Sequence, residues 1–373
     1  MHVPTYSISI DGNDVTSNFD PLLITLRIVD TDGGKADTFS CELDDADGHI
    51  ELPRIGAVVQ AGMGWSDSGS VVMFNGFVDE VRSTGARGQG HLLQIDAKSA
   101  NMRDNLKQPA QRHKDNAKFS DVATQWGQAA GLSSVKVDDA IGSIQRAYWA
   151  MGHESFLVWG TRIAKELGAT FKIMGGTGVF VKRSSGTSTS GKPLTPINAV
   201  YGDNLISWSL APVLSRPEYQ KFLTRWYDTK AAKWMSESVD ALSQDSASGG
   251  VTAQLSHKRQ HANKDNASNQ SGSNSIESDR DKGGGTVTIQ GNPDAASQAP
   301  CIVSGVRPGV DGTYRIETAT HDLTRGKSYT TELALKQPSG SAGTDSRGAP
   351  GGSSGSATPG GSSGSAPAGG TTP

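Results

Sequence analysis

The segment PLLITLRIVD, residues 21 to 30, alternates side chains with a period of two. One predicted face consists of four apolar residues, Leu22, Ile24, Leu26 and Ile28. This period is typical of a half-buried antiparallel strand. FSCELDD (39–45) and HLLQIDAKS (91–99) show the same alternation. Residues 1–108 are therefore predicted to form a small β domain, a barrel or a sandwich, whose five or six strands are joined by Asp- and Gly-rich turns.

The pattern changes between residues 109 and 200. FSDVATQWGQAAGL (119–132) predicts a short helix with Ser120 as its N-cap. ESFLVWGTRIAKELGA (154–169) predicts a longer helix that ends at Gly168, and its apolar residues share one face. These residues are Phe156, Gly160, Ile163, Ala164 and Leu167. A strand, a Gly-rich turn and another strand follow, so this region is predicted to be an α/β module.

Residues 201–338 return to β patterns and are predicted to form a second β-barrel domain with a polar insert at about 238–284. The insert has few large apolar residues, which leaves open either one solvated helix near 257–268 or an irregular chain. Residues 339–373 are almost all Gly, Ser, Ala, Pro and Thr, which predicts a flexible tail. The predicted fold class is mainly β, with two small antiparallel β-barrel domains flanking a helix-containing α+β domain.

Composition narrows the functional classes. Of the 373 residues, 35 are Lys or Arg and 38 are Asp or Glu, a net charge of -3 that argues against a dedicated nucleic-acid binder. The N-terminus lacks a signal-peptide pattern, and no stretch approaches the ~20 apolar residues of a membrane span. No membrane anchor is therefore expected. Cys41 and Cys301 have no metal-type spacing, which predicts two buried free thiols.

His153 and Glu154 in WAMGHESFLVWG (149–160) raise the question of a metal-dependent hydrolase. A zinc helix needs H-E-x-x-H, but the second histidine position is Leu157, so the pair is predicted to mark only a helix start. His257 and His261 are four residues apart in a polar stretch, which predicts a solvated face. The glycine-rich segments GARGQG (85–90) and GGTGVF (175–180) are predicted turns. We expect no catalytic residues, no cofactor and no metal.

The order of several segments resembles the phage late control D family, the contractile-tail baseplate hub proteins that are related in architecture to the hub part of VgrG spikes. The resemblance covers roughly residues 20–338. The segments that carry it are IELPRIGAVVQAGM (50–63), VVMFNGFVDEV (71–81), FSDVATQWGQAAGL (119–132), ESFLVWGTRIAKELGATFKI (154–173), TIQGNP (288–293), VRPGVDGTYRIETATHDL (306–323) and SYTTELALKQP (328–338). The polar insert and the C-terminal tail depart from the family pattern.

The resemblance implies a structural protein of the virion. Such hubs form a homotrimer in which each chain supplies two related β-barrels, and this ring adapts a sixfold tail tube to a threefold spike. The implied partners are the tail tube protein, the central spike protein and other baseplate components, and DNA passes through the bore without specific binding. The implied location is the tail baseplate, assembled in the host cytoplasm. Tyr148 and Trp149, predicted to be exposed ahead of the second helix, are the candidate subunit contacts.

Three alternatives remain open from the sequence. The first is the hub of a phage-derived bacteriocin or of a secretion-like injection system. The second is a tail-associated cell-wall hydrolase, although no spare segment is long and apolar enough for a fused lysozyme-like domain. The third is a free carbohydrate-binding β protein, which would be monomeric with an aromatic cleft.

Overall fold

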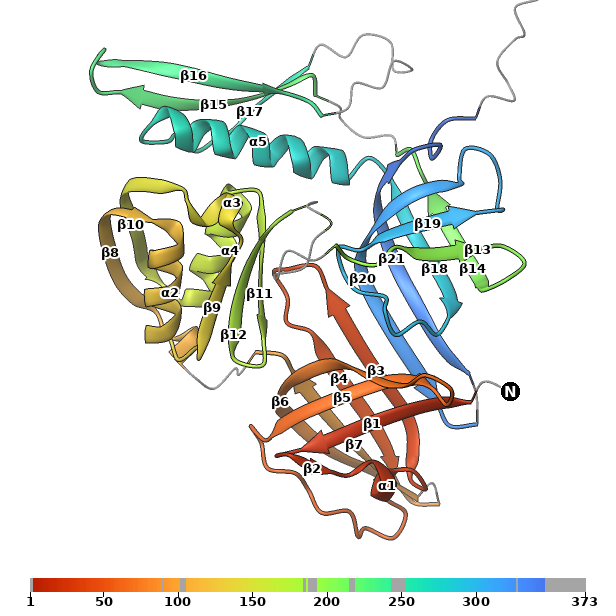
Figure 1. The fold of residues 1–373 in the computed structure, drawn as a ribbon. Coiled ribbons are helices and arrows are strands. Elements are labelled where there is room, and N and C mark those ends of the chain that lie inside the picture. Colours follow the sequence, from red (N-terminus) through yellow and green to blue (C-terminus); the bar gives the residue numbers. More distant parts are fainter. Residues whose placement is uncertain are drawn as a thin grey trace, which may run out of the picture.

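A computed structural model describes residues 3–88, 90–100, 105–183, 186, 193–214, 219–242, 253–326 and 328–345. Two β units share one 13-stranded sheet, and a helix-containing module lies beside them (Figure 1). The prediction of a mainly β fold with an α+β module is confirmed. Within the described ranges, no helix combines the length and apolar character needed to cross a membrane.

The first β unit surrounds one apolar core, built from alternate residues of its strands. Its elements are β1 (Pro4–Ile10), β2 (Asn13–Asp14), α1 (Thr16–Phe19), β3 (Leu23–Thr31), β4 (Thr38–Asp44), β5 (Val58–Trp65), β6 (Gly69–Ala86) and β7 (Gly90–Lys98). Leu323 and Tyr329, which come from the far end of the chain, complete this core. The first unit therefore cannot bury its apolar face without the C-terminal strands.

The strand predicted from PLLITLRIVD is β3, but part of its buried face differs from the prediction. A β-bulge between Leu23 and Thr25 shifts the pairing with β4. Leu23 is buried and Ile24 is only partly buried, the reverse of the prediction, whereas Leu26 and Ile28 are buried as predicted. A bulge adds one residue to a strand and so reverses the alternation on one side of it.

The α/β module has its own core, which is rich in aromatic rings. Its elements are η1 (Asn105–Lys107), β8 (Ala110–Lys118), α2 (Phe119–Ala129), β9 (Ser134–Val137), α3 (Asp139–Gly142), β10 (Gln145–Glu154), α4 (Phe156–Glu166), β11 (Ala169–Met174) and β12 (Thr177–Lys182). Both predicted helices are confirmed, and the predicted face of α4 is buried. The predicted N-cap Ser120 is wrong, because α2 begins at Phe119 and Lys118 occupies the cap position.

The second β unit contains strands that come before and after a long inserted segment of the chain, which lies between β14 and β18. It contains β13 (Ile197–Val200), β14 (Leu205–Ala211), β18 (Gly284–Gln290), β19 (Pro300–Ser304), β20 (Gly312–Thr324) and β21 (Tyr329–Ser339) around a third core. β20 pairs with β19 through its first residues and with β3 through its last seven, Thr318–Thr324. β20 and β21 thus extend from the second unit alongside the first (Figure 1).

The inserted segment forms a hairpin layer, defined as β15 (Lys221–Asp228), β16 (Lys233–Asp240), β17 (Gln254–Ser256) and α5 (Lys264–Arg280). The predicted polar insert at about 238–284 thus contains a long ordered helix, which starts later than the helix considered near 257–268. Polar contacts hold it in place. Ser271 Oγ lies 2.8 Å from Thr224 Oγ1, Ser275 Oγ donates to the Asp240 carbonyl at 3.1 Å, and Ser273 Oγ donates to the Lys165 carbonyl. Small side chains allow this close approach, so the helix is ordered without an apolar stripe.

Cys41 on β4 and Cys301 on β19 are buried free thiols, which confirms the prediction for both. Burial raises the pKa of the Cys301 thiol to about 12, and it raises the pKa of the Cys41 thiol as well. Because the thiolate is the reactive form, we expect neither cysteine to react with a thiol reagent in native protein at pH 8. Both should react after denaturation in urea. Rapid labelling of one thiol in the native state would contradict this expectation.

Candidate functional site: a charged junction and an open groove

The two candidate contact residues occupy different environments on β10. Tyr148 is 59% exposed, and its ring lies 6.1 Å from that of His113. Trp149 is only 1% exposed, and its indole nitrogen donates to the Ala117 carbonyl at 2.8 Å. The prediction that Trp149 is exposed is therefore wrong, and the residue belongs to the module core. Adjacent residues of a strand point to opposite faces, so only one of the two was able to remain at the surface.

His153 and Glu154 lie at the end of β10 and not at a helix start, which corrects the prediction. The helix begins two residues later, and Ser155 caps it by accepting from the Val158 backbone nitrogen. Glu154 instead forms an ion pair with Arg162 at 2.5 Å. Among the described residues, no group of three or more His, Cys, Asp or Glu side chains is arranged to hold a metal ion.

His261 is also not solvated as predicted. Its side chain is only 11% exposed, and its Nδ1 lies 3.7 Å from Glu166. Burial lowers the pKa of His261, and this effect outweighs the nearby Glu166 carboxylate, which raises it. His257 lies beside it, with a ring separation of 6.1 Å. The two histidines belong to the contact between the hairpin layer and the α/β module, because Glu166 is on α4.

At the end of β3, both β units, the α/β module and the hairpin layer come into contact. The Lys172 ammonium, from β11 of the α/β module, donates to Asp30 and lies 2.8 Å from Asp37. Asp30 also accepts from the Ser297 backbone nitrogen at 2.7 Å and from the Ser297 hydroxyl at 3.0 Å. Asp30 therefore connects the first β unit with both the α/β module and the second β unit.

Asp32, two residues after Asp30, makes a similar set of contacts. It accepts from the Thr170 hydroxyl and from the Gln298 side-chain amide, each at 2.9 Å. Its other carboxylate oxygen lies 2.6 Å from Arg280, the last residue of α5. We call Asp30, Asp32, Asp37, Lys172 and Arg280 the charged junction. It links the first unit, the module and the hairpin layer through ion pairs, and the second unit through hydrogen bonds.

The electrostatics of the charged junction identify it as a structural network. Lys172 pairs with both Asp30 and Asp37. When both carboxylates are ionised, these three side chains carry one net negative charge. Burial raises the pKa of Asp37 to about 6, whereas the Lys172 ammonium and the Ser297 donors hold the pKa of Asp30 below its ordinary value. A pocket of about 350 Å³ lies beside these groups. Lys172 pairs with Asp30 and Asp37, Arg280 pairs with Asp32, and Ser297 and Gln298 donate to Asp30 and Asp32, so we interpret these groups as connectors between the units.

The Asp37 pKa predicts a dependence of stability on pH. Its pKa is raised in the folded state, so the folded chain binds a proton that the unfolded chain releases between pH ~4 and pH 6. The contribution of Asp37 to the free energy of unfolding therefore falls as the pH rises through this window. We expect Asp37→Asn to remove this component, as measured by urea unfolding at pH 4.5 and 6.5. An unchanged difference between the two pH values would contradict the assignment.

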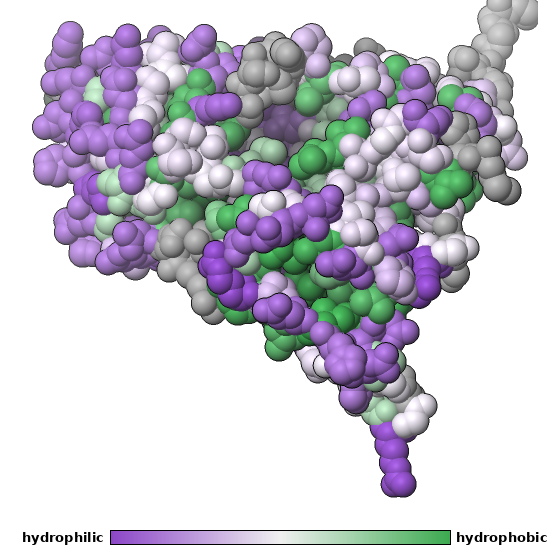
Figure 2. Space-filling view, turned by 60° about the horizontal axis from the view of Figure 1, so that its bottom comes forward, coloured by the Kyte–Doolittle hydropathy of each residue, from purple (hydrophilic) through white to green (hydrophobic). Residues whose placement is uncertain are grey.

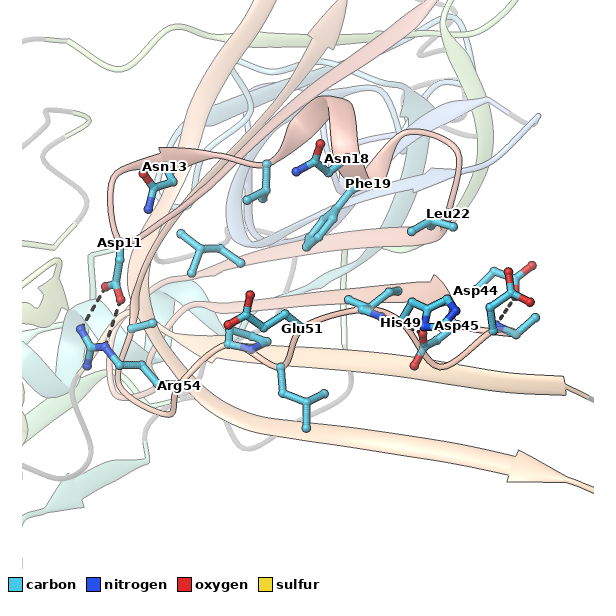
Figure 3. A pocket seen from close by; sticks show the side chains of 18 residues that line it. Asp11, Asn13, Asn18, Phe19, Leu22, Asp44, Asp45, His49, Glu51 and Arg54 are labelled. Carbon is cyan, nitrogen blue, oxygen red and sulfur yellow. Dashed lines mark hydrogen bonds and ion pairs between the residues drawn. The ribbon is translucent and has the colours of Figure 1, made fainter.

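The open end of the first β unit carries a groove of about 780 Å³. The space-filling view shows apolar surface there, bordered by polar side chains (Figure 2). Side chains of β1, α1 and the segment after β4 point into it (Figure 3). Its apolar lining includes Ile10, Val15, Phe19, Leu22, Ile50 and Leu52, and its carboxylates are Asp11, Asp44, Asp45, Asp47 and Glu51.

Several of these carboxylates have structural roles. Asp11 pairs with Arg54 at 3.0 Å, Asp44 accepts from the Ala46 backbone nitrogen, and Asp45 accepts from the Ile50 backbone nitrogen. These contacts form an Asp-rich turn at 44–48, which shapes one wall of the groove. The groove is concave and acidic. Of its carboxylates, Asp44 and Asp45 accept hydrogen bonds within turns, and Asp11 forms an ion pair.

Two phage proteins are similar to the chain in sequence. The probable baseplate hub protein of Escherichia phage 186 is 29% identical over 236 residues, and that of Escherichia phage P2 is 26% identical over 230 residues. The chain is therefore similar in sequence to two probable phage baseplate hub proteins. The alignments cover 63% and 62% of the chain but only 59% and 58% of the relatives, so less than two thirds of their length is matched. No protein-family model matches the chain.

Solved structures share the fold over most of the chain. The 43 kDa tail protein of prophage MuSo2 from Shewanella oneidensis has a TM-score of 0.66 at 14% identity, with 89% of this chain and 98% of that chain covered. A tail protein from Neisseria meningitidis MC58 has a TM-score of 0.65 at 13% identity, covering 89% and 96%. An E. coli component of the type VI secretion system has a TM-score of 0.52 at 10% identity, covering 90% and 78%. The fold is therefore that of phage tail proteins, and the resemblance noted in the sequence is confirmed.

Proposed function

We propose that the chain is the structural hub of a contractile-tail baseplate. Three copies form a ring that adapts the sixfold tail tube to the threefold spike. The observation that carries the proposal is the presence of two β units with the same strand order in one chain, since three copies then supply six similar units. The five strands run β5-β6-β7-β4-β3 in the first unit and β19-β20-β21-β18-β14 in the second. A closed ring of identical chains needs this kind of repeated interface.

The charged junction suits this function because a ring subunit has to hold its units at fixed angles. The proposed partners are the tail tube protein, the spike protein and other baseplate components, and DNA crosses the bore without specific contacts. Assembly in the host cytoplasm, the absence of catalytic activity and a contact role for Tyr148 remain predictions. The hub of a bacteriocin or of another injection system would use the same surfaces.

Electron microscopy of single particles tests the proposal directly. The purified chain, alone and mixed with its spike protein, is expected to form a threefold ring with six lobes and an open bore. A compact asymmetric particle in both samples would argue against the hub. A peptidoglycan zymogram tests the hydrolase alternative, because a clearing band would support an enzyme.

The C-terminal segment allows a prediction by truncation. The flexible tail was predicted to begin at 339, but residues up to 345 are ordered: Ser341 Oγ donates to the Asp311 carbonyl at 2.7 Å and the Gly343 nitrogen donates to Gly309 at 2.8 Å. The predicted tail after 345 lies outside the described residues. We expect deletion of 346–373 to leave the melting temperature and the trimer unchanged. Deletion of 339–373 should lower the free energy of unfolding by about 1–3 kcal/mol, because several backbone contacts are lost.

The two truncated chains are compared by thermal unfolding and by light scattering after size-exclusion chromatography. Loss of the trimer on deletion of 346–373 would show that this segment is a strap between copies and would contradict the expectation.

A further inference from the structure

The two β units repeat each other down to their bulges. β3 and β14 each carry a bulge after their first residue, and β6 and β20 each carry a bulge in their pairing with the next strand. The matched pairs, first unit and then second, are Leu23–Leu43 with Leu205–Ile289, Leu26–Cys41 with Trp208–Val287, Val78–Ala97 with Ile316–Leu335, and Glu80–Asp96 with Thr318–Ala334. This correspondence equates β14 with β3 and β20 with β6, residue by residue.

Within one chain, β3 makes a joint between the two units. One edge of β3 pairs with β4, and its other edge pairs antiparallel with the last residues of β20. Leu26 lies opposite Leu323, and Arg27 lies opposite Asp322 with an ion-pair distance of 2.6 Å. The joint therefore consists of a β3-type strand of one unit and the C-terminal half of a β6-type strand of the other unit.

The counterparts of these two edges have no partner among the described strands. β14 pairs with β18 on one edge, and its other edge makes only an isolated bridge at Leu205. The C-terminal half of β6 pairs with β7, whereas β5 reaches only to Phe77 on the other edge. Ile206 and Trp208 on β14 are 58% and 41% exposed, and residues 82–86 of β6 are all exposed. The unpaired backbone N–H and C=O groups of such a strand edge are a template for pairing with another chain.

We propose that β14 of one copy pairs antiparallel with residues 82–86 of β6 in a second copy of this chain, in the register of the β3–β20 joint. This inference rests on the proposed ring and specifies the contact between its subunits. The register follows when β3 is replaced by β14 and β20 by β6 at the matched positions. Trp208 then lies opposite Gly85, Ser209 opposite Thr84 and Leu210 opposite Ser83. The occupant is a second copy because the same chain already makes the equivalent joint internally.

The residues at these positions suit one another. Trp208 is the bulkiest side chain on β14, and it faces Gly85, which has no side chain to obstruct the ring. Ala211 is the last residue of β14, and Pro212 then ends the pairing because it has no backbone N–H to donate. Each copy contributes one β14 edge and one β6 edge. The contact is therefore heterologous, and it closes into a ring when the rotation between successive units repeats.

Disulfide trapping tests the register. Residues directly opposite in an antiparallel pair have Cβ atoms about 4.5–5.5 Å apart, close enough for a disulfide after small adjustments. The double variant Ser209→Cys/Thr84→Cys is expected to give a covalent trimer on a non-reducing gel after mild oxidation. Arg27→Cys/Asp322→Cys, at the equivalent joint inside the chain, is the matched positive control and should stay at monomer mass. Ser209→Cys/Arg82→Cys is displaced by two residues and should cross-link several-fold less.

A charge exchange provides a second readout that does not depend on thiol chemistry. Ser209→Arg with Thr84→Asp recreates the Arg27–Asp322 pair between copies, whereas Ser209→Asp with Thr84→Asp opposes two like charges at the same place. Both positions are exposed, so the monomer should fold equally well in both variants, as checked by thermal unfolding. In low salt, we expect the trimer of the Arg/Asp variant to dissociate at a several-fold lower protein concentration than the trimer of the Asp/Asp variant, as measured by light scattering.

The outcomes separate this inference from the proposed function. A wild-type trimer in which the Ser209/Thr84 pair does not cross-link, and in which the charge variants dissociate alike, would overturn the register and leave the ring intact. A wild-type chain that stays monomeric at all concentrations would overturn both. Cross-linking equal to that of the displaced control would also contradict the inference.

Discussion

Replacement of Lys172 by alanine is expected to lower the free energy of unfolding by about 3–5 kcal/mol, because it leaves two buried carboxylates without their counter-charge. Asp30 and Asp37 both depend on this ammonium, and all three side chains are largely buried. The charged junction holds the units together, so we also expect the α/β module to separate from the sheet before global unfolding. Urea unfolding followed by tryptophan fluorescence measures the loss.

A matched control is Lys165→Ala, which removes an ion pair with Glu277 in which both partners are exposed. Surface pairs contribute about 0–1 kcal/mol, so this change should be small. The triple variant Asp30→Asn, Asp37→Asn and Lys172→Met removes every charge of the group, and we expect it to be more stable than Lys172→Ala alone. A loss below about 1 kcal/mol for Lys172→Ala would show that the junction does not fasten the units.

Replacement of Trp159 by alanine is expected to destabilise the α/β module by about 3–5 kcal/mol. The side chain is fully buried, and its ring lies 4.9 Å from that of Trp126 and 5.6 Å from that of Phe156. Its indole nitrogen also donates to the Ala150 carbonyl at 3.1 Å. The substitution leaves a large cavity and an unpaired carbonyl, so near-ultraviolet circular dichroism should show loss of the aromatic signal at a lower urea concentration.

Trp234→Ala is the matched control, because Trp234 is 55% exposed on the hairpin layer. It removes the same side chain from a site with little packing, and its effect on stability should stay within about 0.5 kcal/mol. Equal effects of the two substitutions would contradict the assignment of Trp159 to the core. Such a result would also imply that the module tolerates a loss of packing as large as a tryptophan.

Local patterns predicted much of the secondary structure. The helix from Phe156 was visible because its apolar residues repeat at helical spacing, and Gly168 ended it as expected with a positive φ of 64°. The strands near residues 25, 40 and 95 were visible from their alternation. These signals are local, because a helix or a strand that packs on a core has its apolar residues on one face, regardless of which element it packs against.

Two features differ from what the sequence indicated, one because of a tertiary contact and one because a strand was not recognised. The helix of the hairpin layer has serine on its buried face, and a serine is buried only where a partner such as Thr224 accepts its hydroxyl. Trp149 was placed at the surface because it was assigned to the approach to a helix, whereas it lies on a strand. Reading residues 145–154 as a strand would have predicted that one of Tyr148 and Trp149 points inward.

The sequence by itself determined the mainly β class, the two longer helices of the α/β module, the two buried thiols and the resemblance to tail hub proteins. Only the tertiary structure decided how the two β units join. Arg27 and Asp322 are 295 positions apart, and no local pattern relates them. The bulges that match β3 with β14 became visible only once each strand had its partner. The charged junction has the same origin, because a buried Asp or Lys is tolerated only where distant segments bring its counter-charge.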